Sequence, residues 1–508
     1  MKKTFFKSLM IAALIVPTFT ACELDQYPTT SIPGEKSWEK PSDATNFHKG
    51  LYSTLRSLAG TGYLWGDIMM DYFQPTISYG NRGGLLYTWT YSANDVGGPW
   101  SSGYSAISDC NYYLTSVDKI DYSKSTDRAT DSILLRQYKG EAYFIRAVAY
   151  SNIVSYYCRT YDAGTAATTR GLPLLTKVDV SAKPRSANLK ATYEFILNDL
   201  KMADDLLQAD GPDEDAAVGV LINKTMTKAL RARVLLNMGD YTNALAEAEA
   251  LINSGHFALA NSANALKDMW INDQGSEFIY VPAGTPDERY EYGTSTNGNN
   301  FHAYSTAAGA FSPDWIPSKA TVEMYSTNDW RTKIYLDPKD MKCQDQKASN
   351  VALFNKFLNN PNLGKKGDSK YAQYSLPKLF RIAETYLIAA EAAYRLNNVA
   401  KAQQYLNALR TKRGLLATSE TGESLAKEIR MEWKREFMGE GMYFHVLKRW
   451  GLGFQRDATP QTGAANIVYS ANASANIGLT VEPTFHDNWT FDIPTQEKEM
   501  NPNVELFD

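Results

Sequence analysis

Aromatic residues gather in two stretches of this chain that lack a sustained helical period, Gly60 to Gly103 and about His256 to Gln373. A flat ring offers a surface on which the apolar CH face of a sugar stacks, and fixing its two torsions costs little entropy. The rings that we expect in such a platform are Trp65, Trp89, Tyr290, Tyr292 and Trp315. Asp67, Arg82 and Asn94 lie close to the first group and would supply the polar contacts that orient a sugar. The alternative is that most of these rings belong to the core, because tryptophan and phenylalanine are highly buried on average.

No pattern of residues singles out a catalytic or metal centre. The five histidines are widely separated: His48, His256, His302, His445 and His486. The sequence contains no His-Glu-x-x-His, Gly-x-Ser-x-Gly or phosphate-loop motif. With 56 acidic residues, carboxylate pairs suited to glycoside hydrolysis occur by chance. Glu436 and Glu440 share a helical face, and we interpret them as members of an ion-pair network with Arg435, Arg449 or their neighbours. The sequence therefore predicts a binding protein without cofactor, rather than an enzyme.

Helices must position the two aromatic stretches. Apolar residues recur at helical intervals in four early segments, Asn46 to Leu58, Tyr104 to Val117, Leu134 to Tyr157 and Ala191 to Leu207. In the segment Met226 to Asn253, small and apolar residues fall where a tetratricopeptide repeat places them. Asn397-Asn398-Val399-x-x-Ala402 repeats the spacing of Gly239-Asp240-Tyr241-x-x-Ala244. Because one helical pair cannot bury its own face, these observations predict a mostly α fold, with a discontinuous tetratricopeptide-like scaffold and two loop-rich insertions.

The first 22 residues indicate export. Lys2, Lys3 and Lys7 precede an apolar run, Leu9 to Val16, that is shorter than the ~20 residues needed to span a bilayer. Phe19-Thr20-Ala21-Cys22 is typical of a lipobox, so residues 1–21 are predicted to be a signal peptide and Cys22 to carry lipid. The alternative is a plain secretory signal followed by an incidental cysteine.

Charge and cysteine content exclude further classes. A net charge of −4 and a pI near 5.9 provide no basic surface for nucleic acid. Without Cys22, three widely spaced cysteines remain, Cys110, Cys158 and Cys343. An odd number argues against a disulfide framework or a zinc site. We expect buried thiols, although a single long-range disulfide is possible.

The C-terminal segment carries the most specific pattern. Its ordered motifs are Arg381-x-Ala383-Glu384, Ala390-Glu391-Ala392, Leu406-Asn407-x-Leu409-Arg410, Glu432-x-x-x-Glu436-Phe437-x-x-Glu440-Gly441 and Lys448-Arg449-Trp450. This set resembles the SusD/RagB family, nutrient-uptake outer-membrane lipoproteins of Bacteroidota. The resemblance extends from Leu24-Asp25-Gln26-Tyr27-Pro28 to Asn501-Pro502-Asn503, and it departs from the family pattern at Tyr443 and Val446.

The resemblance implies one SusD-like unit over residues 22–508. Its parts would be a repeat-containing region to about residue 270, a loop-rich insertion over 271–375 and a helical region over 376–508. It also implies a lipid-anchored, non-catalytic protein at the outer membrane, facing the cell exterior. This protein would capture an oligosaccharide and deliver it to a TonB-dependent (SusC-like) transporter. The alternatives are capture of a peptide or other nutrient and, less favoured, a glycoside hydrolase.

The lipobox can be tested directly. Cys22→Ala should release a folded protein into the soluble fraction, because the helical scaffold needs no lipid to bury its core. Fractionation of cells, followed by a high-salt wash of the outer membrane, measures the distribution. A variant that stays with the washed membrane would show that Cys22 is not the anchor.

Overall fold

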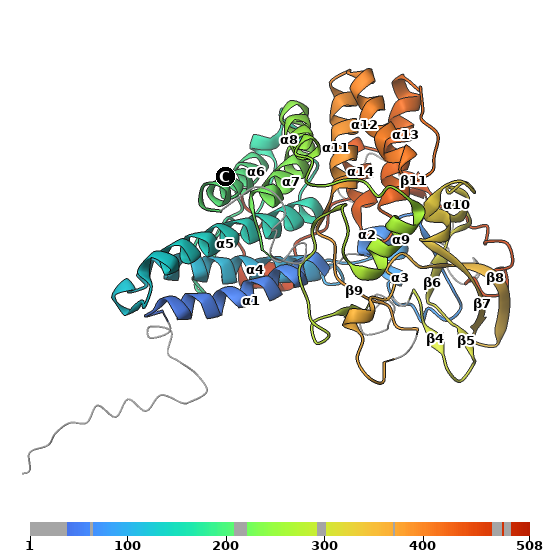
Figure 1. The fold of residues 1–508 in the computed structure, drawn as a ribbon, viewed down its shortest axis with the longest axis horizontal. Helices are drawn as coiled ribbons and strands as arrows, with labels where there is room; N and C mark the ends of the chain where they lie inside the picture. The colour runs from blue at the N-terminus through green and yellow to red at the C-terminus, as the bar shows by residue number, and fades with distance from the viewer. Residues whose placement is uncertain are drawn as a thin grey trace, which may run out of the picture.

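The computed structural model describes residues 38–60, 64–207, 221–291, 301–368, 371–469, 480–481 and 489–507. Three long helices, α1 (Pro41–Gly60), α4 (Gly98–Ser116) and α5 (Arg128–Tyr157), pack side by side as an elongated arm (Figure 1). The Asp127 side chain accepts a hydrogen bond from the backbone N–H of Thr130 and so caps the start of α5. Each helix includes the range that its periodicity predicts, apart from the last residue predicted for α4. The predicted signal peptide and Cys22 lie outside the described residues.

The tetratricopeptide-like repeats stack as predicted, although they are far apart in sequence. Helix α6 (Leu189–Leu206) packs on α7 (Lys224–Asn237), which forms a hairpin with α8 (Tyr241–Asn253). Helix α8 in turn packs on α11 (Ile382–Arg395), the partner of α12 (Val399–Thr411) (Figure 1).

The two hairpins turn by the same local geometry. Gly239 and Asn397 have positive φ angles of 72° and 59°, a conformation that glycine and asparagine adopt more readily than other residues. The next residues, Asp240 and Asn398, cap α8 and α12 by accepting hydrogen bonds from backbone N–H groups three positions later. This shared geometry explains the spacing that the two sequence motifs have in common.

The C-terminal helices α13 (Gly422–Glu436) and α14 (Met442–Trp450) lie beside this stack, and the short α15 (Thr495–Met500) follows near the end of the chain. Gly439 and Gly441, with φ angles of 81° and 70°, separate α13 from α14. A Cβ on Gly439 would lie 2.3 Å from the Phe354 ring, so this turn requires glycine both for its φ angle and for space.

The second insertion contains more regular structure than the sequence predicts. It includes α9 (Ala263–Asn272), α10 (Lys319–Glu323) and a four-stranded sheet in the order β4-β5-β7-β8. These strands are β4 (Tyr304–Ser305), β5 (Ala310–Phe311), β7 (Leu336–Cys343) and β8 (Gln346–Phe354). Its remaining strands are β2 (Phe278–Tyr280), β3 (Tyr290–Glu291), β6 (Trp315–Pro317) and β9 (Tyr374–Ser375). The prediction of a loop-rich insertion did not include this sheet, because most strands are too short to show a period and the longer hairpin carries charges on its exposed face.

The first insertion is made of short elements. These are α2 (Trp65–Met69), β1 (Phe73–Pro75) and α3 (Gly84–Tyr87). The remaining strands of the described chain are also short: β10 (Phe380–Arg381), β11 (Phe454–Gln455) and β12 (Thr480–Val481).

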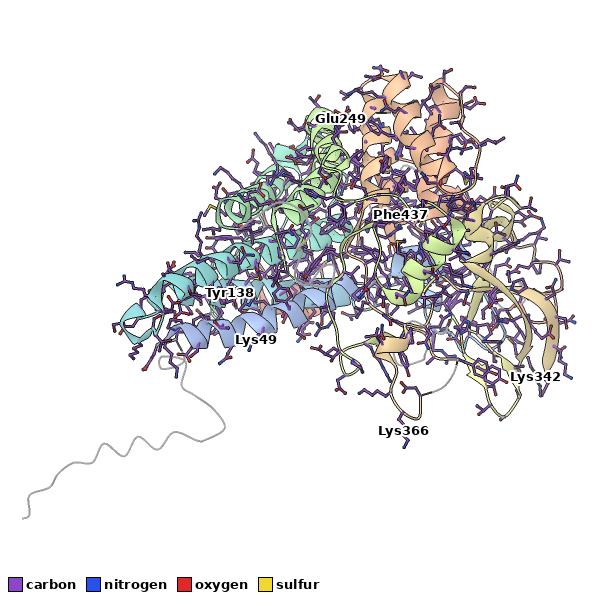
Figure 2. The ribbon with its side chains drawn as sticks, viewed as in Figure 1. Lys49, Tyr138, Glu249, Lys342, Lys366 and Phe437 are labelled. Atoms are coloured by element: carbon purple, nitrogen blue, oxygen red, sulfur yellow. The ribbon has the colours of Figure 1, made fainter. Side chains whose placement is uncertain are left out.

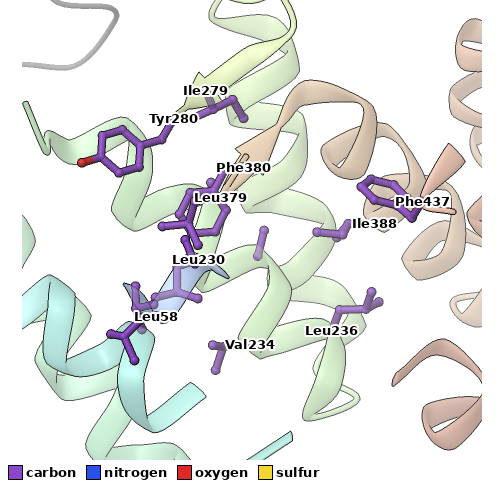
Figure 3. Packing of buried hydrophobic residues seen from close by; sticks show 14 of the residues in the cluster. Leu58, Leu230, Val234, Leu236, Ile279, Tyr280, Leu379, Phe380, Ile388 and Phe437 are labelled. Atoms are coloured by element: carbon purple, nitrogen blue, oxygen red, sulfur yellow. The ribbon is translucent and has the colours of Figure 1, made fainter. Parts of the chain in front are cut away.

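Side chains from distant segments form the main hydrophobic core. Leu58 of α1, Leu230 of α7, Phe380 of β10 and Ile388 of α11 belong to one buried cluster with Phe437 (Figure 3). Phe437 therefore lies inside the molecule, whereas Lys342 lies near its edge on the four-stranded sheet (Figure 2). A second, smaller cluster lies under that sheet and includes Phe311, Met341 and Ile467.

A buried ionic network joins the second insertion to the C-terminal helices. Glu436 is fully buried and accepts hydrogen bonds from three arginines. Arg413 donates to it at 2.8 and 2.9 Å, Arg381 at 2.8 Å and Arg331 at 3.0 Å. Burial by itself would raise the pKa of Glu436, but Arg413, Arg381 and Arg331 outweigh burial and hold this pKa well below its usual value.

Other carboxylates complete the network. Arg413 also binds Glu277, Arg331 also binds Asp329, and Arg381 also binds Glu440 at 2.5 and 3.0 Å. The Lys356 ammonium lies 2.5 Å from Glu440. The predicted network is therefore present, but its partners differ from Arg435 and Arg449. Those two arginines pair with Glu432 and Glu391.

The three cysteines are free and buried, as predicted. Burial raises the pKa of the Cys158 thiol to about 12. No helix in the described ranges is long and apolar enough to cross a membrane.

Removing the charge of Glu436 should strongly destabilise the protein. Glu436→Gln leaves three buried arginines without their shared carboxylate, and breaking a buried pair in this way costs about 3–5 kcal/mol. Urea unfolding followed by circular dichroism measures the free energy. The matched control is Glu423→Gln, because the Glu423 side chain is 77% exposed and pairs with Arg430 at the surface. We expect the control to lose no more than about 1 kcal/mol. Equal losses in the two variants would contradict a structural role for the network.

Candidate ligand-binding surface

Strand pairing brings the two insertions together. Strand β1 of the first insertion pairs antiparallel with β6 of the second, with Phe73 opposite Pro317 and Pro75 opposite Trp315. The ladder continues past β1, where the backbone N–H of Thr76 donates to the carbonyl of Asp314 at 2.8 Å. The expectation that distant aromatic stretches meet is therefore confirmed for these segments.

A third segment, from the C-terminal region, joins the same place. The backbone N–H of Ile77 donates to the carbonyl of Ile467 at 2.8 Å, and that of Tyr469 donates to the carbonyl of Pro75 at 2.9 Å. Residues 75–77 are consequently held from two sides by main-chain hydrogen bonds, and the backbone N–H of Tyr79 donates back to the carbonyl of Thr76 at 3.1 Å. A loop fixed in this way presents its side chains in a defined geometry.

Two tyrosines from these segments form a half-buried aromatic pair. The rings of Tyr79 and Tyr469 are 5.0 Å apart and inclined by 67°, and Tyr79 also contacts Trp315 edge-on at 5.7 Å. The Tyr79 hydroxyl donates to the side-chain oxygen of Asn81 at 3.2 Å. Burial, followed by the proximity of Tyr469, raises the pKa of Tyr79. The Tyr79 and Tyr469 rings remain partly accessible to solvent, and they can stack on an apolar face of a ligand.

An arginine–aspartate pair lies beside these rings. The Nε and Nη2 atoms of Arg82 each donate to Asp314 at 2.5 Å, and Nη2 also donates to the carbonyl of Ser78 at 3.1 Å. The Asp314 side chain is 1% exposed, whereas that of Arg82 is 40% exposed. The hydrogen bonds that Arg82 donates to Asp314 raise the pKa of Arg82. The buried carboxylate therefore orients a guanidinium whose outer edge can still donate to a polar ligand.

A tight turn places Arg82 next to Tyr79. Asn81 and its neighbour Gly80 have φ angles of 62° and 54°, and Gly83 has a φ angle of 74°. Asparagine and glycine are the residues that adopt this left-handed conformation most readily. The run Gly80-Asn81-Arg82-Gly83-Gly84 is thus the local sequence signal for this site. We name the half-buried tyrosines Tyr79 and Tyr469, with Asn81, Arg82 and Asp314, the tyrosine–arginine surface.

Two of the predicted contact residues lie inside the protein. The Trp315 side chain is completely buried against Tyr79 and Tyr87, so its ring presents no face to a ligand. Asp67 is also completely buried and accepts a hydrogen bond from the backbone N–H of Gly441 at 2.6 Å. Burial raises the pKa of Asp67 well above its usual value. These two side chains are structural: Trp315 supports Tyr79, and Asp67 fixes the turn before α14.

Trp65 and Trp89 belong to a different aromatic group, formed with the C-terminal region. The Trp89 ring lies 5.0 Å from that of Trp489, and its Nε1 donates to the carbonyl of Met69 at 2.8 Å. Trp65 contacts Phe491 at 6.4 Å. Both tryptophans are half-buried, so a ligand-contacting role for them stays a prediction, as it does for Arg82 and for the exposed Asn94.

The structure leaves the predicted tyrosines of the second insertion unassigned. The backbone of Tyr290 pairs with that of Ser375, but its side chain and the whole of Tyr292 lie outside the described residues. Asp314 and Tyr469 were not predicted. Asp314 directly precedes a tryptophan that the sequence did indicate, whereas nothing in the sequence around Tyr469 marks it.

A cavity lies elsewhere, among helices α5, α7, α11, α13 and α14. This cavity of about 130 Å³ is lined by Ser151, Arg233, Glu384, Trp433 and His445, among others. Its charged groups are already paired, for example Arg233 with Glu384 at 2.6 and 2.8 Å. A cavity of this size has room for water but is small for an oligosaccharide. Across the part of the chain that the structure describes, no cluster of histidine, cysteine, aspartate or glutamate is arranged to hold a metal ion.

Two protein-family models match this sequence. A family model described as "SusD family" matches residues 191–505. A second model, described as "Starch-binding associating with outer membrane", matches residues 61–236.

Two curated relatives match most of the chain. Both are SusD-like proteins of Formosa agariphila. One is 25% identical over 466 residues, which cover 82% of this chain and 83% of the relative. The other is 22% identical over 502 residues, with 88% and 90% covered.

Solved structures show the same fold. A putative sugar binding protein from Bacteroides vulgatus superposes with a TM-score of 0.71 at 24% identity, covering 92% of this chain and 98% of that one. The surface glycan-binding protein A from Bacteroides uniformis gives a TM-score of 0.64 at 17% identity, with 91% and 98% covered.

Proposed function

This chain belongs to the SusD family, and on that premise we propose that it captures an oligosaccharide at the outer membrane without cleaving it. The observation that carries the proposal is the tyrosine–arginine surface. Aromatic rings next to an oriented guanidinium match the two faces of a sugar, because its CH groups are apolar and its hydroxyls accept and donate hydrogen bonds.

The rigidity of this surface favours binding of a ligand. Main-chain hydrogen bonds hold its loop from two sides, and the Arg82 guanidinium is engaged by a buried carboxylate. A preformed site loses little conformational entropy when a ligand binds. The names of two structural relatives, a sugar binding protein and a surface glycan-binding protein, support a carbohydrate ligand.

Anchoring and delivery complete the proposal. We propose that lipid on Cys22 holds the protein at the membrane, facing the exterior, and that the protein passes its ligand to a TonB-dependent (SusC-like) transporter. The name of the second family model supports outer-membrane association. The stacked helical pairs offer a broad surface away from the sheet for such a partner (Figure 1). Capture of a peptide or other nutrient is the alternative, and the guanidinium edge of Arg82 would suit a carboxylate in that case.

Binding should depend on the exposed ring of Tyr79. Electrophoresis in native gels containing soluble starch, xylan, laminarin or alginate should show retardation of the wild-type protein by at least one polymer. Tyr79→Ala should weaken this binding by ~1–3 kcal/mol, by analogy with base–aromatic stacking. The control is Tyr122→Ala, because Tyr122 is a half-buried tyrosine at the end of the arm, where it contacts Arg128. Undiminished retardation of a folded Tyr79→Ala variant would rule out this surface as the binding site.

The protein should leave its ligand intact. Overnight incubation of purified protein with each polymer should produce no new reducing ends, since we assign no residue a catalytic role. A reducing-sugar assay with chromatography of the products measures this. If products form and disappear on substitution of a single carboxylate, the protein is a hydrolase rather than a binding protein.

A further inference from the structure

A second aromatic pair lies on the four-stranded sheet, outside the tyrosine–arginine surface. The rings of Tyr304 and Tyr371 stack with centroids 3.6 Å apart and planes inclined by 22°. The edge of Phe311 supports both rings, at 5.2 Å from Tyr304 and 5.6 Å from Tyr371. Both tyrosines are half-buried, because they pack against the smaller hydrophobic cluster and keep part of their surface in water.

An ion pair lies near Phe311, the ring that supports this pair. Asp337 and Lys339 form an ion pair at 2.7 Å, with each side chain 34% exposed. The Lys339 ammonium also lies 5.9 Å from the centre of the Phe311 ring. A hydrogen bond with Tyr371 raises the pKa of Tyr304, so the two hydroxyls lie next to each other. The composition repeats that of the tyrosine–arginine surface: two tyrosines beside a partly exposed ion pair.

A short piece of chain links the two places. Phe311 supports the second pair, and Asp314, three residues later, holds Arg82 of the first surface. Three residues span at most about 10 Å. Between them, the Ser312 and Ser78 hydroxyls are 3.1 Å apart, which fixes this link against the first insertion. The residues that support the two aromatic pairs are therefore close together along one fixed segment.

We propose that Tyr304 and Tyr371, with Asp337 and Lys339, form a second sugar-contacting surface, so that the protein binds an extended oligosaccharide across both aromatic pairs. This inference rests on the proposed function and specifies the ligand further as a chain of several sugar units. A ligand that reaches both surfaces gains from the second contact at high effective concentration, since the first contact already holds it nearby. Short oligosaccharides reach only one surface and bind more weakly.

The test measures how binding affinity depends on oligosaccharide length, in the wild-type protein and in variants of the second surface. Oligosaccharides from the disaccharide to the octasaccharide are prepared from the polymer that retards the wild-type protein, and calorimetry measures their affinity. For the wild type, affinity should rise with length and then level off. Tyr304→Ala should weaken binding of the octasaccharide about tenfold and leave that of the shortest bound oligosaccharide unchanged. Tyr304→Phe keeps the ring and should retain most of the affinity.

A second variant tests the same surface without removing a ring that packs on the sheet. Lys339→Gln removes a partly exposed charge without opening the core, and it should also weaken octasaccharide binding selectively. Tyr122→Ala remains the control. If folded Tyr304→Ala or Lys339→Gln protein binds the octasaccharide with full affinity, the second surface is refuted while the proposed function stands. If none of the polymers retards the wild-type protein, the proposed function and this inference are both contradicted.

Discussion

Glu436 is the residue on which the arrangement of this protein depends most. A carboxylate removed from water must be surrounded by opposite charge and hydrogen bonds to be tolerated, and here three arginines meet that requirement. Arg331 follows α10 in the second insertion, Arg381 precedes α11, and Arg413 follows α12. One side chain thereby positions the insertion relative to two helices. Because Asp314 belongs to the same insertion, the network also determines where this carboxylate meets Arg82.

Much of the helical fold could be predicted from the sequence because its signals are local. The helical period of α5 and the shared turn geometry of Gly239 and Asn397 depend only on neighbouring residues. The sheet of the second insertion could not be predicted in this way. Strands of two or three residues such as β3 and β6 exist through pairing with distant partners, and no window of sequence contains that information.

The candidate site, too, could be predicted only where its signal is local in the sequence. The aromatic content of both insertions indicated a binding surface, but sequence does not distinguish a ring that faces solvent from one that supports it. Trp315 is a supporting ring, and Tyr79 is one of the rings that it supports. Trp89 illustrates the limit in another way, because its φ angle of 56° is unusual for a bulky residue. Contacts with Met69 and Trp489 hold it in that conformation. Such constraints arise only in the assembled molecule.

The separation of the two repeat hairpins has a consequence for how the chain matures. Helix α8 completes its packing only against α11, which lies more than a hundred residues later in sequence. Until α11 emerges, α8 packs on α7 alone, and the arginines that neutralise Glu436, namely Arg331, Arg381 and Arg413, also lie later in the chain. Folding that waits for such distant contacts is slow. In a tandem repeat array, each hairpin can pack as soon as the next one forms. The order of the segments along this chain instead delays completion of the helical stack until α11 and α12 are present.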